Sequence, residues 1–372
     1  MSPPAAIRGA EVPVDSVEVA AYTVPTDAPE ADGTLAWEQT TIVVVHALGG
    51  GKRGLGYTYA DLSTAKLVES KLAGVVRGMD ALSPQAAWAA MVRQTRNLGR
   101  PGVVSMAISA LDVALWDLKA RLLELPLCVL LGQAEACVPV YGSGGFTAYD
   151  DAQLSEQLAG WVAEGIPRVK MKVGSHPGDD PRRVRVAREA IGEDTELFVD
   201  GNGAYSRKEA LLLAEEFREQ ARVSWFEEPV SSDDLAGLRL LRNRAPAGMA
   251  IAAGEYGYDA TYFARMIDAC AVDVLQADIT RCGGITELLR VDGLCRAHQL
   301  PLSLHCGPAI HTHPGTALDR LVHLEYFHDH VRIEDMLFEG VPELRDGALW
   351  PDRTRPGMGL ELKAAEAERY AA

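Results

Sequence analysis

The second half of the chain repeats one pattern, in which a short apolar run ends in Gly, Asp or Glu and an amphipathic helix leads to the next run. This alternation predicts parallel strands joined by crossover helices, because parallel neighbours cannot be linked by a tight turn. We expect strands at 138–145, 168–174, 196–203, 223–230, 249–256, 273–280, 300–307 and 323–327. Eight such strands favour an α/β class and a closed (β/α)₈ (TIM) barrel with a modified last unit. The last crossover helix is expected at 315–322.

The chain before Val138 has a different pattern. Two strand-like runs, 17–22 and 40–47, flank a polar segment at 25–39, and helices are expected at 61–77 and 105–123. This order predicts a small sheet with a helical layer, which is an α+β unit separate from the barrel.

Charge and apolar patterning exclude several classes of partner. The formal net charge is −16, from 36 basic and 52 acidic residues, so neither nucleic acid nor an anionic membrane is expected as a partner. No apolar run approaches the length of a membrane span, and the first twenty residues do not read as a signal peptide. The six cysteines are scattered and form no CxxC pair, which favours free thiols in the cytoplasm.

Titratable residues end nearly every predicted barrel strand. Asp200, Glu227 and Glu255 end three successive strands. Neighbouring strands lie about 4.8 Å apart, so three carboxylates in register can meet on one cation. An all-oxygen set suits Mg²⁺, whereas zinc prefers histidine or thiolate, so a zinc hydrolase is poorly supported. Each acid taken alone would be interpreted as a solvated loop residue or a helix cap.

Two lysines on one strand are candidate bases. Lys170 and Lys172 are two residues apart, so they share a face of the strand. If that face is the barrel interior, the two ammonium groups and a metal would depress each other's pKa and make a base near neutral pH. The alternative is a pair of outward lysines, with Met171 inside.

The opposite side of the predicted mouth carries a second acid–base candidate. Asp278 and His305 end consecutive strands, and an aspartate beside a histidine fixes its tautomer and raises its pKa. Glu325 on the last strand could be a protonated donor to a developing oxyanion or part of a structural salt bridge. Ser143 could donate to the same oxygens or simply form a turn. His311 and His313 receive no role.

Taken together, the markers KMK (170–172), DGN (200–202), FEEP (226–229), GE (254–255), QAD (276–278) and His305 in SLHCG make the chain resemble the enolase superfamily, within its mandelate racemase group. The resemblance implies a capping domain at 1–137, a modified (β/α)₇β barrel at 138–327, and a C-terminal segment at 328–372 that returns to the capping domain. It implies Lys172 as a base, with Asp278 and His305 as a dyad. It also implies Asp200, Glu227 and Glu255 as Mg²⁺ ligands.

The same resemblance carries Ser143 and Glu325 over to the substrate site, and we add Asn202 of the DGN motif and Trp37. Asp278 stands where muconate-cycloisomerase-like members have a lysine, which disfavours that branch. Substrate choice in the family depends on capping-domain loops, here about 23–38 and 49–58. The first loop is polar and holds Trp37, which suits a polyol such as an acid sugar better than mandelate. The resemblance further implies a homo-oligomer, an octamer in many members.

Three functions follow as hypotheses. The first is dehydration of an acid sugar to a 2-keto-3-deoxy acid, with Lys172 or His305 taking the α-proton of the carboxylate substrate through an enediolate. The second is a racemase or epimerase, in which the two residues act on opposite faces of one carbon. The third is a non-catalytic barrel that has kept a metal site.

Overall fold

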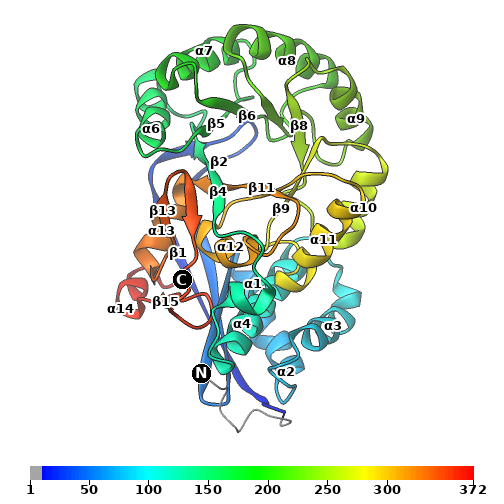
Figure 1. The fold of residues 1–372 in the computed structure, drawn as a ribbon, viewed down its shortest axis with the longest axis vertical. Helices are drawn as coiled ribbons and strands as arrows, with labels where there is room; N and C mark the ends of the chain where they lie inside the picture. The colour runs from blue at the N-terminus through cyan, green and yellow to red at the C-terminus, as the bar shows by residue number, and fades with distance from the viewer. Residues whose placement is uncertain (1–10) are drawn as a thin grey trace.

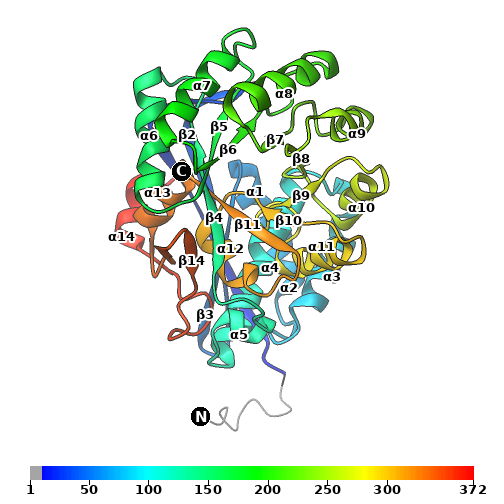
Figure 2. The ribbon, with the colours of Figure 1, turned by 45° about the horizontal axis from the view of Figure 1, so that its top comes forward.

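The computed structural model describes residues 11–372, and the first ten residues of the predicted capping unit lie outside it. Parallel pairing runs from β4 to β11, and a β4–β11 pairing closes the barrel. Figures 1 and 2 show this barrel in green to orange with helices around it. Its strands are β4 (Val138–Gly144), β5 (Arg168–Lys172), β6 (Glu196–Asp200), β7 (Trp225–Glu227), β8 (Ala250–Ala253), β9 (Val274–Ala277), β10 (Leu302–Leu304) and β11 (Leu321–Phe327). The predicted eight-stranded barrel is confirmed.

Strand register brings the polar strand ends to one level. Lys172 pairs with Asp200 across β5 and β6, and Asp200 pairs with Glu227 across β6 and β7. Because side chains alternate along a strand, residues two apart share the interior, as Lys170 and Lys172 do. Both lysines are buried, so their expected inward orientation is confirmed and the outward alternative is wrong.

Crossover helices cover the outside of the barrel. They are α6 (Asp151–Ala163), α7 (Asp180–Ile191), α8 (Arg207–Ala221), α9 (Leu235–Arg244), α10 (Ala260–Asp268), α11 (Ile285–Ala297) and α12 (Pro308–Gly315). The helix expected at 315–322 is wrong: α12 ends at Gly315, and β11 already begins at Leu321. Helix α12 starts directly after residues 305–307. Pro308 is its first residue, where the N–H that proline lacks would have no partner within the helix.

The N-terminal unit is an antiparallel sheet, β1 (Val14–Ala31), β2 (Ala36–Gly49) and β3 (Lys52–Tyr59). Strands were expected at 17–22 and 40–47, and both lie inside longer ones. The polar segment 25–39 is not a loop, because β1 and β2 continue through it and only residues 32–35 turn. An Asp32 side chain that accepts N–H groups from Thr34 and Leu35 holds this turn.

Helices α1 (Leu62–Leu67), η2 (Val68–Leu72), α2 (Ala73–Val76), α3 (Pro84–Thr95) and α4 (Val103–Leu122) pack on this sheet, with the short η3 (Arg96–Leu98) and α5 (Leu127–Leu131). The long helix α4 lies directly on β3. A Cβ at Gly54 would lie 2.3 Å from the Ala114 carbonyl oxygen, and one at Gly56 would lie 2.2 Å from that of Ala110. The two glycines therefore permit the backbone of β3 to touch α4.

The C-terminal segment begins with helix α13 (His328–Leu337), which the sequence reading did not expect. Short strands follow: β12 (Phe338–Glu339), β13 (Glu343–Arg345), β14 (Ala348–Trp350) and β15 (Glu361–Leu362), then α14 (Ala364–Ala367) and η4 (Glu368–Tyr370). The segment contacts the N-terminal unit at several places. Ala372 N–H donates to the Ala21 carbonyl at 3.0 Å, and Met358 N–H donates to Asp117 at 2.6 Å.

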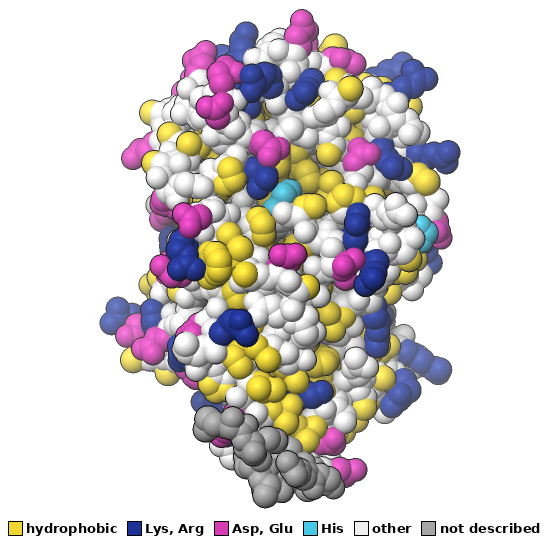
Figure 3. Space-filling view, in the orientation of Figure 1, with side chains coloured by type: hydrophobic (Ala, Val, Ile, Leu, Met, Phe, Trp, Pro, Cys, Tyr) yellow, Lys and Arg dark blue, Asp and Glu magenta, His cyan; other side chains and the backbone are white. Residues whose placement is uncertain are grey.

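The surface drawn in Figure 3 intermingles basic and acidic side chains, with no large patch of either sign on that face of the described chain. All six cysteines are free thiols, and four of them are buried. Within residues 11–372, no helix is both long and apolar enough to cross a bilayer.

Candidate active site

A cavity of about 390 Å³ lies between the barrel mouth and the N-terminal unit. One side is formed by the β1–β2 hairpin and the end of β3. The other side is formed by residues that follow the barrel strands. Its lining residues are Asp32, Leu35, Trp37, Gln39, Thr40, Thr41, Tyr59, Ala60, Asp61, Lys172, Asn202, Glu255, Tyr256, Arg281, His305, Cys306, Phe327 and His330.

Three buried carboxylates meet beneath this cavity. One oxygen each of Asp200, Glu227 and Glu255 lies within 4.8 Å of the other two. All three side chains are at most 3% exposed. Burial and then the charge of Asp200 raise the pKa of Glu227 to about 8. The predicted convergence of these acids is therefore present, and their mutual repulsion is only partly relieved by protein groups.

The two lysines supply that partial relief. Lys170 Nζ lies 2.6 Å from Glu227 Oε1 and 2.8 Å from Glu325 Oε1, and it is fully buried. Lys172 Nζ lies 2.5 Å from Asp200 Oδ2 and also lines the cavity. Only Lys172 can therefore meet a bound molecule directly.

Carboxylates that face the two lysines oppose the expected depression of their pKa values. Burial alone would lower the pKa of Lys172, but the Asp200 carboxylate outweighs burial and raises it. Burial likewise lowers the Lys170 pKa, yet Glu227 and Glu325 raise it well above its usual range. The sequence argument counted the cations but not the carboxylates that face them.

The Asp278–His305 pair has the expected geometry. His305 Nδ1 lies 2.9 Å from Asp278 Oδ2, so Nδ1 carries the proton and Nε2 faces the other way. Nε2 lies 3.2 Å from Glu255 Oε2 and 3.6 Å from Glu325 Oε2. Burial lowers the His305 pKa, but Cys306, Glu255 and Glu325 together raise it well above its usual range.

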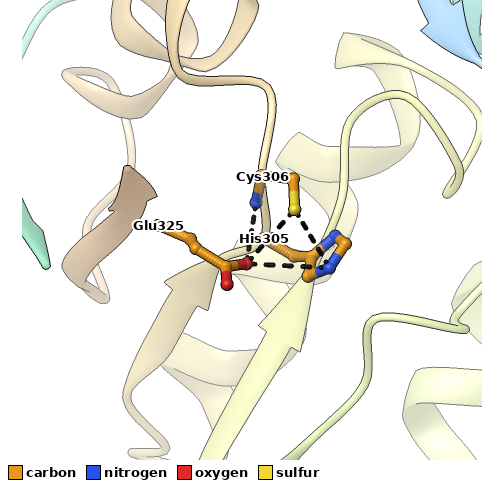
Figure 4. A group of neighbouring side chains, drawn as sticks. All are labelled: His305, Cys306 and Glu325. Atoms are coloured by element: carbon orange, nitrogen blue, oxygen red, sulfur yellow. Dashed lines mark hydrogen bonds and ion pairs between the residues drawn. The ribbon is translucent and has the colours of Figure 1, made fainter. Parts of the chain in front are cut away.

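Figure 4 shows how Cys306 and Glu325 lie around this histidine. The Cys306 Sγ is 3.2 Å from His305 Nε2 and 3.4 Å from Glu325 Oε2. Burial, followed by the charge of Glu325, raises the Cys306 pKa to about 12, so the thiol stays protonated at neutral pH. The sequence reading gave Cys306 no role.

Of the two alternatives for Glu325, the structure shows the salt bridge, which it forms with Lys170. Burial would raise its pKa, but Lys170, His305 and Lys172 lower it below the usual range. Its carboxylate accepts hydrogen bonds from Ser143 Oγ at 2.6 Å and from the Cys306 N–H at 3.1 Å. Ser143 is fully buried against Glu325 and is absent from the cavity lining, so the structure does not bring it to the surface that a substrate would touch.

Asn202 and Trp37 both line the cavity, as expected. Asn202 adopts a positive φ of 45°, and its N–H donates to Asp200 Oδ1 at 2.9 Å. Its own side-chain oxygen has no hydrogen-bond partner in the structure. Trp37 donates from Nε1 to Glu30 Oε2 at 2.7 Å and packs edge-on against Phe146.

Several site residues escaped the sequence reading. Arg281 lies three residues after Asp278 and contacts both Asp278 and Glu255 at the mouth. Tyr59 and His330 stack with ring centroids 3.4 Å apart and close the far side of the cavity. Arg281 could have been predicted as a site residue, because it lies only three residues after Asp278 at the end of a strand. No such signal existed for the stacked pair, which joins the N-terminal unit to α13.

His311 was set aside as a surface or capping residue, but it is fully buried. Its Nε2 accepts the Ile279 N–H at 2.8 Å, and its Nδ1 donates to the Gly307 carbonyl at 3.0 Å. It therefore links the segments that follow Asp278 and His305. His313 is also buried, and its Nδ1 accepts the Cys128 N–H at 3.3 Å, outside the cavity.

The acid triad fits a hard divalent cation. The donors of Asp200, Glu227 and Glu255 are all oxygen, they follow three neighbouring strands, and one oxygen of each lies within 4.8 Å of the other two. Glu228, the second acid of FEEP, is 1% exposed, and its Oε1 has no hydrogen-bond partner among residues 11–372. Burial and then Glu255, Asp200 and Glu227 raise the Glu228 pKa well above its usual range. Excess negative charge at this depth is the condition that a cation relieves.

A further group with metal-ligand spacing is formed by Asp27 and Glu30 on β1 with His328 on α13. Asp27 and His328 already pair at 3.0 Å. This group is not part of the cavity lining.

Comparison with known proteins gives consistent matches along the chain. Residues 16–132 match the mandelate racemase / muconate lactonizing enzyme N-terminal domain, and residues 153–367 match the enolase C-terminal domain-like family. L-talarate/galactarate dehydratase of Salmonella typhimurium is 32% identical over 330 residues, covering 86% of this chain and 79% of that protein.

Two solved structures cover nearly all of the chain. A mandelate racemase/muconate lactonizing enzyme-like protein from Rubrobacter xylanophilus superposes with a TM-score of 0.95 at 61% identity, over 97% of this chain and 100% of its own. A racemase from Streptomyces coelicolor, solved with bound magnesium, superposes with a TM-score of 0.90 at 28% identity, over 96% and 100%.

Proposed function

The chain belongs to the enolase superfamily, within its mandelate racemase group, and on that basis we propose that it is an Mg²⁺-dependent dehydratase of acid sugars. The observation that carries the proposal is the placement of Lys172 and His305 on one cavity above three converging carboxylates. Asp200, Glu227 and Glu255 would hold the cation. The similarity to a talarate/galactarate dehydratase supports the acid-sugar class.

Lys172 and His305 approach the cavity from different sides of the barrel. Strands β4 and β11 separate β5 from β10 in one direction around the barrel, and β6 to β9 separate them in the other. A carbon between the two side chains therefore presents one face to each. Lys172 Nζ accepts the proton from C2, and His305 Nε2 gives a proton to the hydroxyl on C3, which leaves as water. The resulting enol takes up a proton at C3 and becomes a 2-keto-3-deoxy acid.

A bound Mg²⁺ would draw the Asp200 charge away from Lys172 and stabilise negative charge on the substrate carboxylate. The chain's own residues do the rest. Asp278 keeps the His305 proton on Nδ1 and fixes the ring, and Glu325 anchors Lys170 below the reacting groups.

Racemisation or epimerisation is the second candidate. Lys172 and His305 on opposite faces of the substrate suit removal of a proton from one carbon and its return to the other face of that carbon. The similarity to a racemase whose crystal structure contains bound magnesium supports this second candidate. In that reaction one residue removes the proton and the other returns one to the opposite face, so no C–O bond breaks.

One experiment separates the candidates. The Mg²⁺-loaded protein is offered a panel of acid sugars in D₂O, with keto-acid release followed by semicarbazide and C2 deuteration by NMR. Dehydration gives keto-acid, and racemisation gives deuterium at C2 without keto-acid. Lys172→Ala should lower the turnover rate by at least about 10³-fold. Lys208→Ala, which changes an exposed lysine, should leave the turnover rate unchanged. Silence across the panel, or full activity of Lys172→Ala, would refute the proposed function.

A further inference from the structure

The charges of the cavity lining divide sharply between its two sides. The lysine and arginine side chains in the lining, Lys172 and Arg281, stand at the barrel mouth, as does the imidazole of His305. Each already faces carboxylates, Lys172 at 2.5 Å from Asp200 and Arg281 at 3.4 Å from Glu255. The charges of Lys172 and Arg281 are therefore paired with carboxylates next to the acid triad, where the reacting carboxylate of a substrate would lie.

The side formed by the N-terminal unit is different. It contributes two carboxylates, Asp32 and Asp61, and no lysine or arginine among the described lining residues. Asp61 caps helix α1 by accepting the Ser63 N–H at 2.8 Å, and this hydrogen bond lowers its pKa. Asp61 is thus a negative charge on the side of the cavity that the N-terminal unit forms.

His330, which stands at the same far side, does not supply a positive charge either. Burial is the main cause that lowers its pKa to about 3, so the ring is neutral at physiological pH. Its Nδ1 accepts the Gly307 N–H at 3.2 Å, which leaves the Nε2–H as a donor. Gln39, with an exposed amide, is a further neutral partner for hydroxyl groups.

We infer that the substrate is a monocarboxylate with an uncharged hydroxylated tail, an aldonate, and not an aldarate with a carboxylate at each end. The inference rests on the proposed function, because it assumes that one carboxylate lies at the acid triad. The tail then points toward Asp61, Gln39 and His330, which offer hydroxyl partners. A second carboxylate there would meet like charge without a counter-ion, and like-charge contacts of this kind strongly disfavour the wrong ligand.

The test compares matched pairs that share stereochemistry, such as galactonate with galactarate and gluconate with glucarate. Turnover is scored by keto-acid release and by C2 deuteration, so either reaction of the proposed function registers. We expect kcat/KM for the reactive aldonate to exceed that of its aldarate by about 100-fold. Asp61→Asn keeps the helix cap and removes the charge, so it should raise the ratio of the aldarate kcat/KM to the aldonate kcat/KM about 5- to 10-fold.

Glu215→Gln, an exposed acid on α8, is the matched control and should change neither value. Aldarates that react as well as aldonates would overturn the inference and leave the proposed function standing. An Asp61→Asn effect no larger than that of the control would also overturn it. Absence of keto-acid and of deuteration with both series would refute the proposed function, and this inference with it.

Discussion

At the scale of single residues, the site is built from pairs of titratable side chains. The sequence was sufficient to name the members of these pairs, but it was not sufficient to predict their protonation states. The sequence identified Asp278, His305, Lys172 and the acid triad because each ends a strand. It did not reveal that Asp200 lies 2.5 Å from Lys172 or that Glu325 lies 2.8 Å from Lys170. At those distances the carboxylates raise the pKa values of both lysines, and the lysines lower the pKa of Glu325.

Asp278→Asn should reduce kcat by about 10²- to 10⁴-fold with a small change in KM. Asn can present its N–H₂ to Nδ1, which favours the tautomer with the proton on Nε2 and removes the charge that holds the imidazolium. The steady-state rates and the pH profile of the variant check this, and His298→Asn, which changes an exposed histidine, is the control. A normal rate would remove Asp278 from the catalytic dyad.

Glu30 should make the stability of the protein depend on pH. Burial, then the charge of Asp329, raises its pKa to about 8, while Trp37 and Arg332 lower it and Asp27 raises it. The folded state therefore holds the Glu30 proton more tightly than the unfolded state between the usual glutamate range and pH 8. In that window the free energy of unfolding should fall as pH rises, by up to ~1.4 kcal/mol per pH unit.

Glu30→Gln should remove this part of the pH dependence, because the amide oxygen can still accept from Trp37 and no longer titrates. Urea unfolding between pH 5 and pH 9 measures the difference between the two proteins. Equal slopes for the wild type and the variant would show that Glu30 is ionised throughout that range.

At the scale of elements, the strand–helix alternation was sufficient for the barrel but not for the other elements. Barrel strands are buried on both sides and stand out as apolar runs, and their ends follow from Gly, Asp and Glu. The β1–β2 hairpin was missed at 25–39 because its residues are polar and half-exposed on a strand that projects toward the cavity. Helix α13 was missed because polar His328–His330 hid its apolar face, which packs through Ile333 and Leu337.

Gly56→Ala should destabilise the protein by about 2–4 kcal/mol. Its Cβ would lie 2.2 Å from the Ala110 carbonyl oxygen, so β3 and α4 would have to separate. Gly74→Ala in helix α2 is the control, because nothing lies within 4 Å of its Cβ and alanine favours a helix. Thermal unfolding should rank Gly74→Ala at or above the wild type and Gly56→Ala well below it.

The ends of β6, β7 and β8 should be stabilised by divalent cations. Binding to the folded state alone raises the free energy of unfolding by ~2.7 kcal/mol at a hundredfold excess of ligand over Kd. Mg²⁺ should therefore raise the Tm and EDTA should reverse the shift, while Asp200→Asn should abolish the response to Mg²⁺. An unchanged Mg²⁺ shift in Asp200→Asn would place the cation elsewhere.

At the scale of the whole molecule, the N-terminal unit supplies parts that the barrel lacks. Asp112 on α4 accepts the Thr286 N–H at 2.9 Å and the Thr286 hydroxyl at 2.7 Å, so it caps helix α11 of the barrel. Trp88 donates to the Gly283 carbonyl at 2.9 Å beside it. Helix α11 begins without a side-chain cap of its own, at Gly284. The two units are therefore joined by hydrogen bonds that neither could satisfy alone.

Asp112→Ala should weaken this junction by about 1–3 kcal/mol, because it leaves the buried Thr286 amide in the first turn of α11 without an acceptor. The loss should appear on both sides: hydrogen exchange should accelerate in α4 and in the first turn of α11. Asp61→Ala, which removes a cap inside the N-terminal unit, should accelerate exchange in α1 only. If Asp112→Ala affected α4 without α11, the barrel helix would have a source of stability independent of the cap. If hydrogen exchange accelerates in both α4 and α11, the cavity that lies between the two units depends on the same junction. Activity should then decline in proportion to the loss of hydrogen-exchange protection in α11.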